Sequence, residues 1–273
     1  MERDALGEIR RYLLARHVAG MEVAYRMTPD ARPAEGPRES AREIVMITSP
    51  VIERRPGIRV TSEQSAVEQA SLFGEPVRKR DPDLSGFDLA ALAAIVSKCE
   101  RCGLSGGRTR TVFGSGNPSS RIIFIGEAPG REEDLQGLPF VGRAGQLLTK
   151  MLAAIGFARE EVYIANILKC RPPGNREPQE DEMAACEPYL ARQLDLIRPV
   201  MICALGRIAA HGLLKKTTAL GILRQGMHYY NDIPVAVTYH PAALLRNPNL
   251  KRDAWEDLKT MRKLYDEAVR EGE

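Results

Sequence analysis

The sequence contains no apolar run of roughly 18 or more residues, which excludes a transmembrane helix of ordinary length. Its first residues, MERDALGEIRRYLL, carry charges of both signs and lack an apolar core with a small-residue cleavage site, so we expect no secretory signal. Aromatic residues make up only 5% of the chain, but hydrophobic residues reach 44%, which is enough for a core. We therefore expect a soluble, cytoplasmic protein with no membrane partner.

The sequence also lacks a strong excess of charge of one sign. It has 39 Lys and Arg against 36 Asp and Glu, for a formal net charge of +3. This mild positive balance permits nucleic acid as a partner without establishing it, because many cytoplasmic enzymes have the same balance. There is no internal repeat.

The first third of the chain has no sustained hydrophobic period. Residues 7–26 fit one amphipathic helix, which is too short to make a domain alone. Residues 27–85 are rich in Pro, Arg, Glu and Ser, a composition typical of a disordered linker. We therefore expect a mostly disordered N-terminal extension over residues 1–87 and a folded domain over residues 88–273.

Short apolar strands alternate with helices in the second part of the chain. The expected strands are 122–125, 162–168, 200–205 and 235–238. The expected helices are 143–155, 179–197, 207–214 and 250–270. This alternation predicts an α/β fold with three layers, in which helices cover both faces of a central parallel sheet of four strands.

Four of the five cysteines form two separated pairs. Cys99 and Cys102 make a C-x2-C pair before the α/β pattern, while Cys170 ends the second expected strand and Cys186 lies in the next helix. Disulfides are disfavoured in a cytoplasmic protein, so these thiols indicate zinc or an iron–sulfur cluster, and spacing alone does not decide between them. The alternative is that Cys170 and Cys186 are simply buried. Cys203, in the apolar run VMICALG, is expected in the core.

Three expected strand ends carry unusual polar residues. The segment GEAPG at 126–130 precedes several acids and then Phe140, Asn166 lies near the end of the second strand, and His240 follows the last strand. The carboxyl ends of parallel strands meet at one edge of a sheet, so these groups would line one crevice. A ring that stacks, an amide that reads a donor and acceptor edge, and an imidazole that faces negative charge together suit a flat polar heterocycle.

Each of these residues also has a simpler interpretation. Glycines after a strand often only make a turn, and GEAPG lacks the spacing of GxGxxG or a Walker A loop, which disfavours a nucleotide phosphate site. An Asn in a strand can satisfy a local backbone group, and a lone His before Pro is more often structural. The combination at one edge is what favours a binding site.

Three motifs and the four cysteines resemble the family 4 (type 4) uracil-DNA glycosylases, the iron–sulfur members of their superfamily. The motifs are GEAPGREEDLQGLPFVGRAGQLL, NILKCRPPGNREP and HPAALLR, and the match covers about residues 95–265. The resemblance implies an enzyme that flips uracil out of DNA and hydrolyses its N-glycosidic bond, which leaves an abasic site for base excision repair.

The resemblance also implies roles for individual residues. Phe140 would stack on uracil, Asn166 would pair with its polar edge and help to reject cytosine, and His240 would face O2 as the bond breaks. The main chain that would border the base belongs to Gly126, Glu127 and Ala128. A structural 4Fe–4S cluster would be held by Cys99, Cys102, Cys170 and Cys186.

The group that activates water is left open by the resemblance. Family 1 enzymes have an Asp in the motif GQDPYH that orients the attacking water, and Ala128 stands at that position here. Glu127, Glu132 and Glu133 are the candidates; we favour Glu127 for catalysis and also expect Glu132 beside the substrate. The alternative is that these acids are solvated loop charges.

The motif HPAALLR would also contact DNA. Leu244 or Leu245 would wedge into the gap left by the flipped nucleotide, and Arg246 would contact phosphate. The alternative is that the leucines belong to the core. A second set of expected phosphate contacts is Lys169, Arg171 and Arg176.

Two other functions remain open at this point. One is a non-catalytic DNA-binding or DNA-polymerase-associated module of the same fold, and the other is a Rossmann-like nucleotide-binding enzyme with a zinc site. For the glycosylase we expect a monomer that acts on uracil-containing DNA. Residues 1–87 would serve as a tether to a repair or replication protein.

Overall fold

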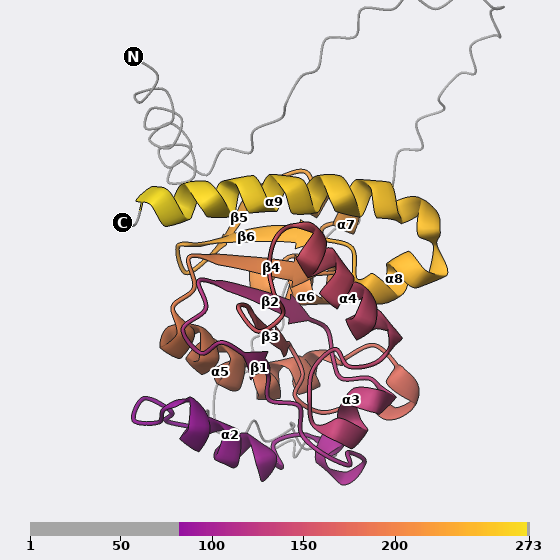
Figure 1. Ribbon diagram of the computed structural model, residues 1–273. Coiled ribbons are helices and arrows are strands. Elements are labelled where there is room, and N and C mark those ends of the chain that lie inside the picture. Colours follow the sequence, from indigo (N-terminus) through magenta and orange to yellow (C-terminus); the bar gives the residue numbers. More distant parts are fainter. Residues whose placement is uncertain (1–81, 272–273) are drawn as a thin grey trace, which may run out of the picture. The chain divides into compact units, whose positions relative to one another are not determined.

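The computed structural model describes residues 82–271 (Figure 1). The helix expected over residues 7–26 and nearly all of the linker expected over residues 27–85 lie outside this range. Among the described residues, no helix combines the length and the apolar character that crossing a membrane requires.

The centre of the fold is a six-stranded sheet in the order β1-β3-β2-β4-β6-β5. The strands are β1 (Ser115–Gly116), β2 (Ile122–Gly126), β3 (Tyr163–Asn166), β4 (Met201–Leu205), β5 (His228–Tyr230) and β6 (Ile233–Thr238). The four inner strands are parallel, which confirms the expected central sheet. The antiparallel edge strands β1 and β5 were not expected, because two or three residues are too few to show a hydrophobic period.

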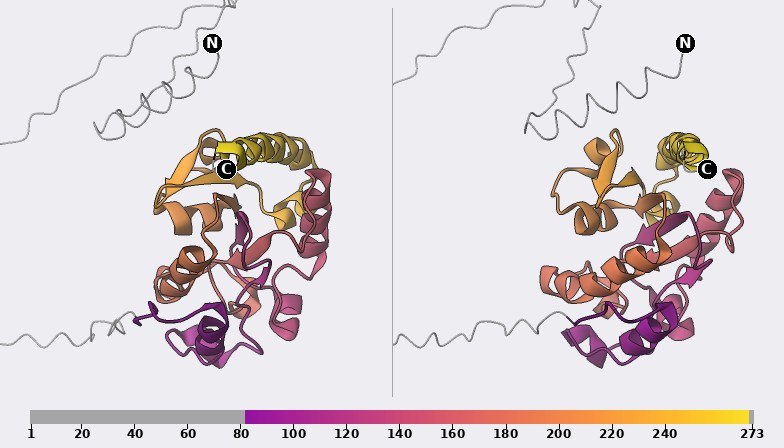
Figure 2. Two further views of the ribbon diagram at one scale, coloured as in Figure 1. Left: turned by 60° about the vertical axis from the view of Figure 1, so that its left-hand side comes forward. Right: turned by 90° about the vertical axis from the view of Figure 1, so that its left-hand side faces the viewer.

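In the described part of the chain, one α-helix precedes the first strand, and the others lie between the strands or after the last of them (Figure 2). They are α2 (Leu89–Ser97), α3 (Arg131–Gln136), α4 (Arg143–Ala154), α5 (Glu180–Ile197), α6 (Arg207–Leu214), α7 (Leu220–Leu223), α8 (Pro241–Arg246) and α9 (Lys251–Glu271). The short 3-10 helices are η1 (Gly103–Gly106), η2 (Pro173–Asn175) and η3 (Pro248–Leu250). The four helices expected from periodicity are confirmed as α4, α5, α6 and α9.

Helices cover both faces of the sheet, so the predicted three-layer arrangement is confirmed. Ile123 and Ile125 of β2 pack in one core cluster with residues of α5 and α6. Ile122 and Phe124 of the same strand pack in a second cluster with residues of α4 and α9. Because successive side chains of a strand point to opposite faces, a strand covered on both sides must be apolar throughout, and all five positions of β2 are buried.

The carboxyl ends of the parallel strands bring the three motifs together. Gly126 at the end of β2 is in register with Asn166 at the end of β3. Leu205 at the end of β4 is in register with Thr238, two residues before His240. The loop after β2 contains helix α3, and α8 begins directly after His240. The edge of the sheet that open α/β folds use for ligands therefore carries all three motifs.

Candidate active site

Asn166 presents an unpaired oxygen inside the protein. Its side chain is only 2% exposed, and among the described residues its Oδ1 is the buried side-chain N or O atom without a hydrogen-bond partner. An unsatisfied buried acceptor costs about 1–3 kcal/mol, so its presence in a folded protein suggests a partner that binds later.

Gly126 makes room for the groups around this oxygen. A Cβ atom at Gly126 would lie 2.5 Å from Asn166 Oδ1 and also 2.5 Å from Cζ of Phe140. The amide and the aromatic ring therefore converge over the same glycine. Ala128, two residues later, is half-buried and packs against the apolar cluster around Cys170.

Phe140 is held in a strained backbone conformation. Its φ angle is 52°, in the left-handed region that β-carbons disfavour, and its side chain is buried. A Cβ atom at Gly145 would clash with the Phe140 carbonyl group, so this glycine lets the start of α4 approach. The Phe140 ring lies 5.5 Å from the His240 ring, centroid to centroid, at an interplanar angle of 35°.

Glu133 holds the loop that carries Phe140. Its Oε1 accepts hydrogen bonds from the backbone N–H groups of Val141 and Gly142, each at 2.9 Å, and its Oε2 accepts one from Gly130 at 3.1 Å. Arg159 supports the same loop by donating from Nη2 to the Pro139 carbonyl at 2.6 Å. Both Glu133 oxygens are thus occupied, which makes this residue a structural member of the loop and a poor candidate for activating water.

Glu127 directly follows β2, and within residues 82–271 its carboxylate accepts no such hydrogen bond. Its side chain is half-buried, and burial raises the pKa of its carboxyl above the ordinary value. The negative charge of Glu177 raises this pKa further, while Arg207 and Arg246 oppose the shift. A raised pKa makes this carboxylate a better proton acceptor than an ordinary glutamate. Glu132 is exposed on α3, and the structure shows no ligand-facing role for it.

His240 is half-buried, and its ring is neutral at pH 7. Burial lowers its pKa to about 4, with the charge of Arg246 acting in the same direction. Its Nδ1 accepts a hydrogen bond from the Ala242 backbone N–H at 3.2 Å. Because that nitrogen is an acceptor, the proton of the neutral ring is on Nε2, which is then a hydrogen-bond donor.

A partly buried ion pair supports the strand end before His240. Arg224 donates to both carboxylate oxygens of Asp257, from Nε at 2.7 Å and from Nη2 at 3.0 Å. Thr238 donates to Asp257 Oδ2 at 2.8 Å, and Arg224 Nη1 donates to the hydroxyl of Tyr239 at 2.8 Å. Sequence patterns give no sign of this network because its members lie on separate elements.

The two leucines of HPAALLR have different positions. Leu244 is 2% exposed and belongs to the interior, whereas Leu245 is 45% exposed. The expectation that Leu244 contacts DNA is therefore corrected: its side chain points inward from α8, and Leu245 is the leucine at the surface. Arg246 is exposed, as a phosphate contact requires.

Lys169, Arg171 and Arg176, the three expected phosphate contacts near the second motif, all bond to other groups of the protein. Lys169 is 1% exposed and donates from Nζ to the Asn166 carbonyl at 2.9 Å and to Gln193 Oε1 at 2.6 Å, so it is not a phosphate contact in this structure. Burial lowers the pKa of Lys169 to about 8. Arg176 forms an ion pair with Glu182. Arg171 is partly exposed and donates from Nε to Asn175 Oδ1 at 2.7 Å.

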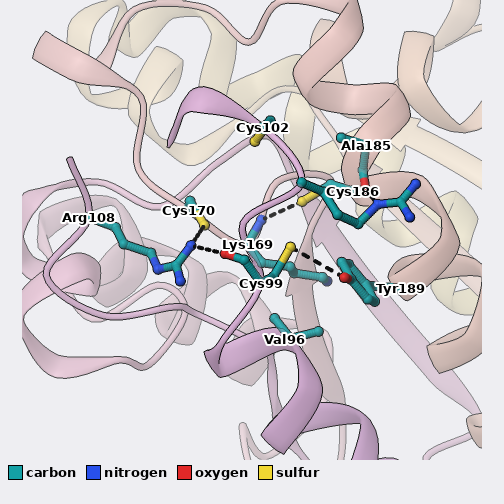
Figure 3. Close-up of a pocket in the computed structure, with 10 residues that line it drawn as sticks. Val96, Cys99, Cys102, Arg108, Lys169, Cys170, Ala185, Cys186 and Tyr189 are labelled. Carbon is teal, nitrogen blue, oxygen red and sulfur yellow. Dashed lines mark hydrogen bonds between the residues drawn. The ribbon is translucent and has the colours of Figure 1, made fainter. Parts of the chain in front are cut away.

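The four cysteines expected to bind a metal line one pocket (Figure 3). Their sulfur atoms come from three separate parts of the fold, namely the segment after α2, the segment after β3 and helix α5. The other residues that line the pocket are Val96, Arg101, Arg108, Lys169, Ala185 and Tyr189, so no carboxylate or imidazole contributes. Cys203 is buried in β4 among apolar residues of the second core cluster, as expected.

Hydrogen-bond donors surround the sulfur atoms. Arg108 Nη1 lies 3.5 Å from the sulfur of Cys170, the Lys169 backbone N–H donates to Cys186 at 3.4 Å, and the Tyr189 hydroxyl donates to Cys99 at 3.3 Å. Burial raises the pKa of the Cys186 thiol to about 12. Without a bound cation the Cys186 thiol would stay protonated, and donors of this kind are typical around metal-bound thiolates. Within residues 82–271 no group of three or more metal-binding side chains is arranged to hold a single ion.

Comparisons with known proteins agree with this geometry. The family model for the uracil DNA glycosylase superfamily matches residues 113–259, more than half of the chain. The chain is 45% identical to a type-4 uracil-DNA glycosylase of Saccharolobus solfataricus over 184 residues, which is 64% of this chain and 85% of the relative. It is 46% identical to those of Sulfurisphaera tokodaii and Archaeoglobus fulgidus, over 62% of this chain in each case and over 81% and 89% of the relatives. The chain therefore belongs to the uracil DNA glycosylase superfamily, and within it to the type-4 enzymes.

Proposed function

We propose that this protein is a DNA glycosylase that removes uracil from DNA by hydrolysing the N-glycosidic bond, the activity after which its type-4 relatives are named. The observation that carries the proposal is the unpaired Oδ1 of Asn166, buried beside the ring of Phe140 and near the neutral ring of His240. A base inside a duplex cannot reach such a pocket, so the target nucleotide must be flipped out of the stack.

The pocket accounts for selection of uracil over cytosine. The N3 atom of uracil carries a proton that it can donate to Asn166 Oδ1, whereas the N3 atom of cytosine has none to give. Cytosine would therefore leave the buried oxygen unpaired, and sites built to bond a polar group reject analogues that lack it. The Phe140 ring, fixed by its strained backbone and by Glu133, supplies a flat surface on which the base stacks.

His240 stabilises the departing base. The bond that breaks joins C1′ of the sugar to N1 of uracil, and the electron pair leaves with the base, so negative charge grows on O2. A neutral imidazole with its proton on Nε2 donates a hydrogen bond to that oxygen. Water then adds to the oxocarbenium-like sugar, and the half-buried carboxylate of Glu127, whose pKa is raised, would accept the proton that this water loses.

DNA contacts come from the residues around the pocket mouth. Leu245, the exposed leucine of α8, would fill the gap left by the flipped nucleotide, and Arg246 would contact a neighbouring phosphate. Arg171, which is partly exposed in the loop after β3, is a further candidate for a phosphate contact. Glu132 is exposed and stays a candidate for a contact near the substrate.

The four cysteines fit a 4Fe–4S cluster, the cofactor that the resemblance to the type-4 enzymes implies. All four line one pocket to which no histidine or carboxylate of residues 82–271 contributes, and four cysteine thiolates are the usual ligands of such a cluster. The cluster would be held by Cys99, Cys102, Cys170 and Cys186, and it would serve to tie the segment after α2 to β3 and α5.

We further infer the setting in which the enzyme works. Its product, an abasic site, makes it the first enzyme of base excision repair. We expect a cytoplasmic monomer with the catalytic domain over residues 88–273. Residues 1–87, nearly all of which lie outside the described range, would provide a contact to a repair or replication protein.

Alkali treatment of a labelled oligonucleotide with a single uracil tests the proposal, with thymine and cytosine oligonucleotides as controls. We expect strand cleavage at uracil only, and we expect the Asn166→Ala variant to lose it. Protein with an intact metal site that binds the oligonucleotide but yields no cleavage would instead identify the non-catalytic DNA-binding module.

A further inference from the structure

Lys169 is a buried cation that links Asn166 to the cysteine pocket. Its ammonium group donates to the backbone carbonyl of Asn166 at 2.9 Å and to the side chain of Gln193 at 2.6 Å. Its own backbone N–H donates to the sulfur of Cys186 at 3.4 Å. We infer that Lys169 is a positioning residue for base recognition, which fixes the end of β3 so that the Asn166 amide meets the base. The inference rests on the proposed function.

The Asn166 carbonyl needs this partner because its strand neighbour has ended. In a strand, the C=O group of one residue and the N–H group of the next point to opposite sides. The Ile167 N–H bonds to the Gly126 carbonyl of β2, so the carbonyl of Asn166 faces the other side, toward β1. Strand β1 pairs only with Tyr163 and Ile164 and stops short of Asn166. The Lys169 ammonium group takes the place of the missing strand.

The ammonium group is itself held in place. Gln193, fully buried on α5, accepts its second hydrogen bond and donates from Nε2 to the Phe113 carbonyl at 3.0 Å and to the Tyr163 hydroxyl at 3.3 Å. The Lys169 carbonyl accepts a hydrogen bond from the Val112 N–H at 2.7 Å. The Lys169 side chain therefore ties the end of β3 to α5, so that the position of one depends on that of the other.

The consequence concerns the Asn166 side chain, which has no other anchor at Oδ1. Its orientation toward the base depends on its backbone, and the backbone depends on Lys169. A displacement of about 1 Å at a reacting site can lower activity by about 100-fold. Lys169 would thus affect recognition of the base without touching it.

A double-mutant cycle between Lys169→Met and Asn166→Ala tests the inference. Methionine keeps the length and the apolar part of the lysine but removes all its N–H donors. We expect Lys169→Met to lower kcat/KM on a uracil oligonucleotide by about 10- to 100-fold. In the Asn166→Ala background the same change should have little further effect, because the amide through which Lys169 acts is already gone.

Iron content and the visible absorption spectrum must be recorded for each variant, since Lys169 also bonds to Cys186. We expect both to match the wild type, which separates positioning from loss of the metal site. Lys216→Met, at an exposed lysine after α6, is the matched control and should change neither activity nor iron content.

Three results would overturn the inference. The first is an unchanged kcat/KM for Lys169→Met. The second is a double variant whose fold-loss in kcat/KM equals the product of the two single losses, as for independent sites. The third is a loss of activity in proportion to a loss of iron. If Lys169→Met does not fold, Gln193→Leu replaces it in the cycle. The leucine variant should show a smaller loss that again vanishes with Asn166→Ala, and full activity of Gln193→Leu would refute the role of Lys169. Absence of uracil excision by the wild type would refute the proposed function as well, whereas a fully active wild type with independent variants refutes the positioning role alone.

Discussion

Asn166 and Gly126 approach so closely that a Cβ atom at position 126 would lie 2.5 Å from the Asn166 side-chain oxygen. The backbone of Gly126 does not have a positive φ angle, so the glycine is not required by a turn. The glycine is required because any side chain at this position would overlap the Asn166 amide and the Phe140 ring.

Replacing Asn166 should separate activity from stability. Asn166→Ala removes the amide that reads the base, and we expect uracil excision to fall by at least about 100-fold, as for loss of one preorganised hydrogen-bonding group. It also removes an unpaired buried oxygen, so the melting temperature should stay the same or rise. Single-turnover kinetics and thermal unfolding check both parts. A large drop in melting temperature would show that the amide has a structural partner.

Replacing Glu127 should affect the chemical step. Glu127→Gln keeps the shape but removes the proton acceptor, and we expect the single-turnover rate to fall by about 100-fold, within the usual contribution of a general base. Glu160→Gln, at an exposed glutamate between α4 and β3, is the matched control and should keep the activity. If Glu127→Gln retains the full rate, water is activated by another group.

The neutral state of His240 should make stability depend on pH. Burial lowers its folded-state pKa to about 4, below the ordinary histidine value of 6.5. Above pH 6.5 the ring is neutral in both states; as the pH falls from 6.5 to 4, the unfolded chain binds the proton first, and the free energy of unfolding decreases. The loss amounts to about 3 kcal/mol by the lower end of this window. His240→Gln should lack this part of the dependence.

Denaturant unfolding of the wild type and of His240→Gln at pH 7 and pH 4.5 measures the difference. Carboxyl groups titrate in both proteins, so only the difference between the two curves reports on His240. Parallel curves would show that the folded protein binds a proton on His240 as readily as the unfolded chain does.

The metal site should depend on four cysteines and not on the fifth. Cys170→Ser and Cys186→Ser should lose iron and the broad visible absorbance of an iron–sulfur cluster, and their melting temperatures should fall. Cys203→Ala, in the apolar core of β4, should keep both iron and colour. Iron analysis with absorption spectroscopy decides this, and a colourless protein with one bound zinc ion would contradict the cluster.

The exposed leucine of α8 should matter for duplex DNA. Leu245→Ala removes the side chain that would fill the vacated position, and we expect kcat/KM on a duplex with a uracil pair to fall by about 10-fold, since unstacking a step costs a few kcal/mol. Activity on single-stranded DNA should change less. Ile222→Ala, at another exposed aliphatic residue, is the control. Equal losses on both substrates would argue against a wedge.

From the sequence we could predict the α/β class, the inner parallel strands and four of the helices, because these depend on local hydrophobic periods. We could also predict that Gly126, Phe140, Asn166 and His240 would meet, since strand ends of a parallel sheet share one edge. The roles of these residues in catalysis stay predictions until the variants are measured.

The direction in which individual side chains point became known from the three-dimensional structure and not from the sequence. Leu244 and Leu245 are identical neighbours, yet packing of α8 buries the first and exposes the second. Lys169 looks like a surface cation in the sequence, but the end of β1 leaves a carbonyl that draws its ammonium group inward. Such choices follow from hydrogen bonds and packing between segments distant in sequence, which no local pattern records.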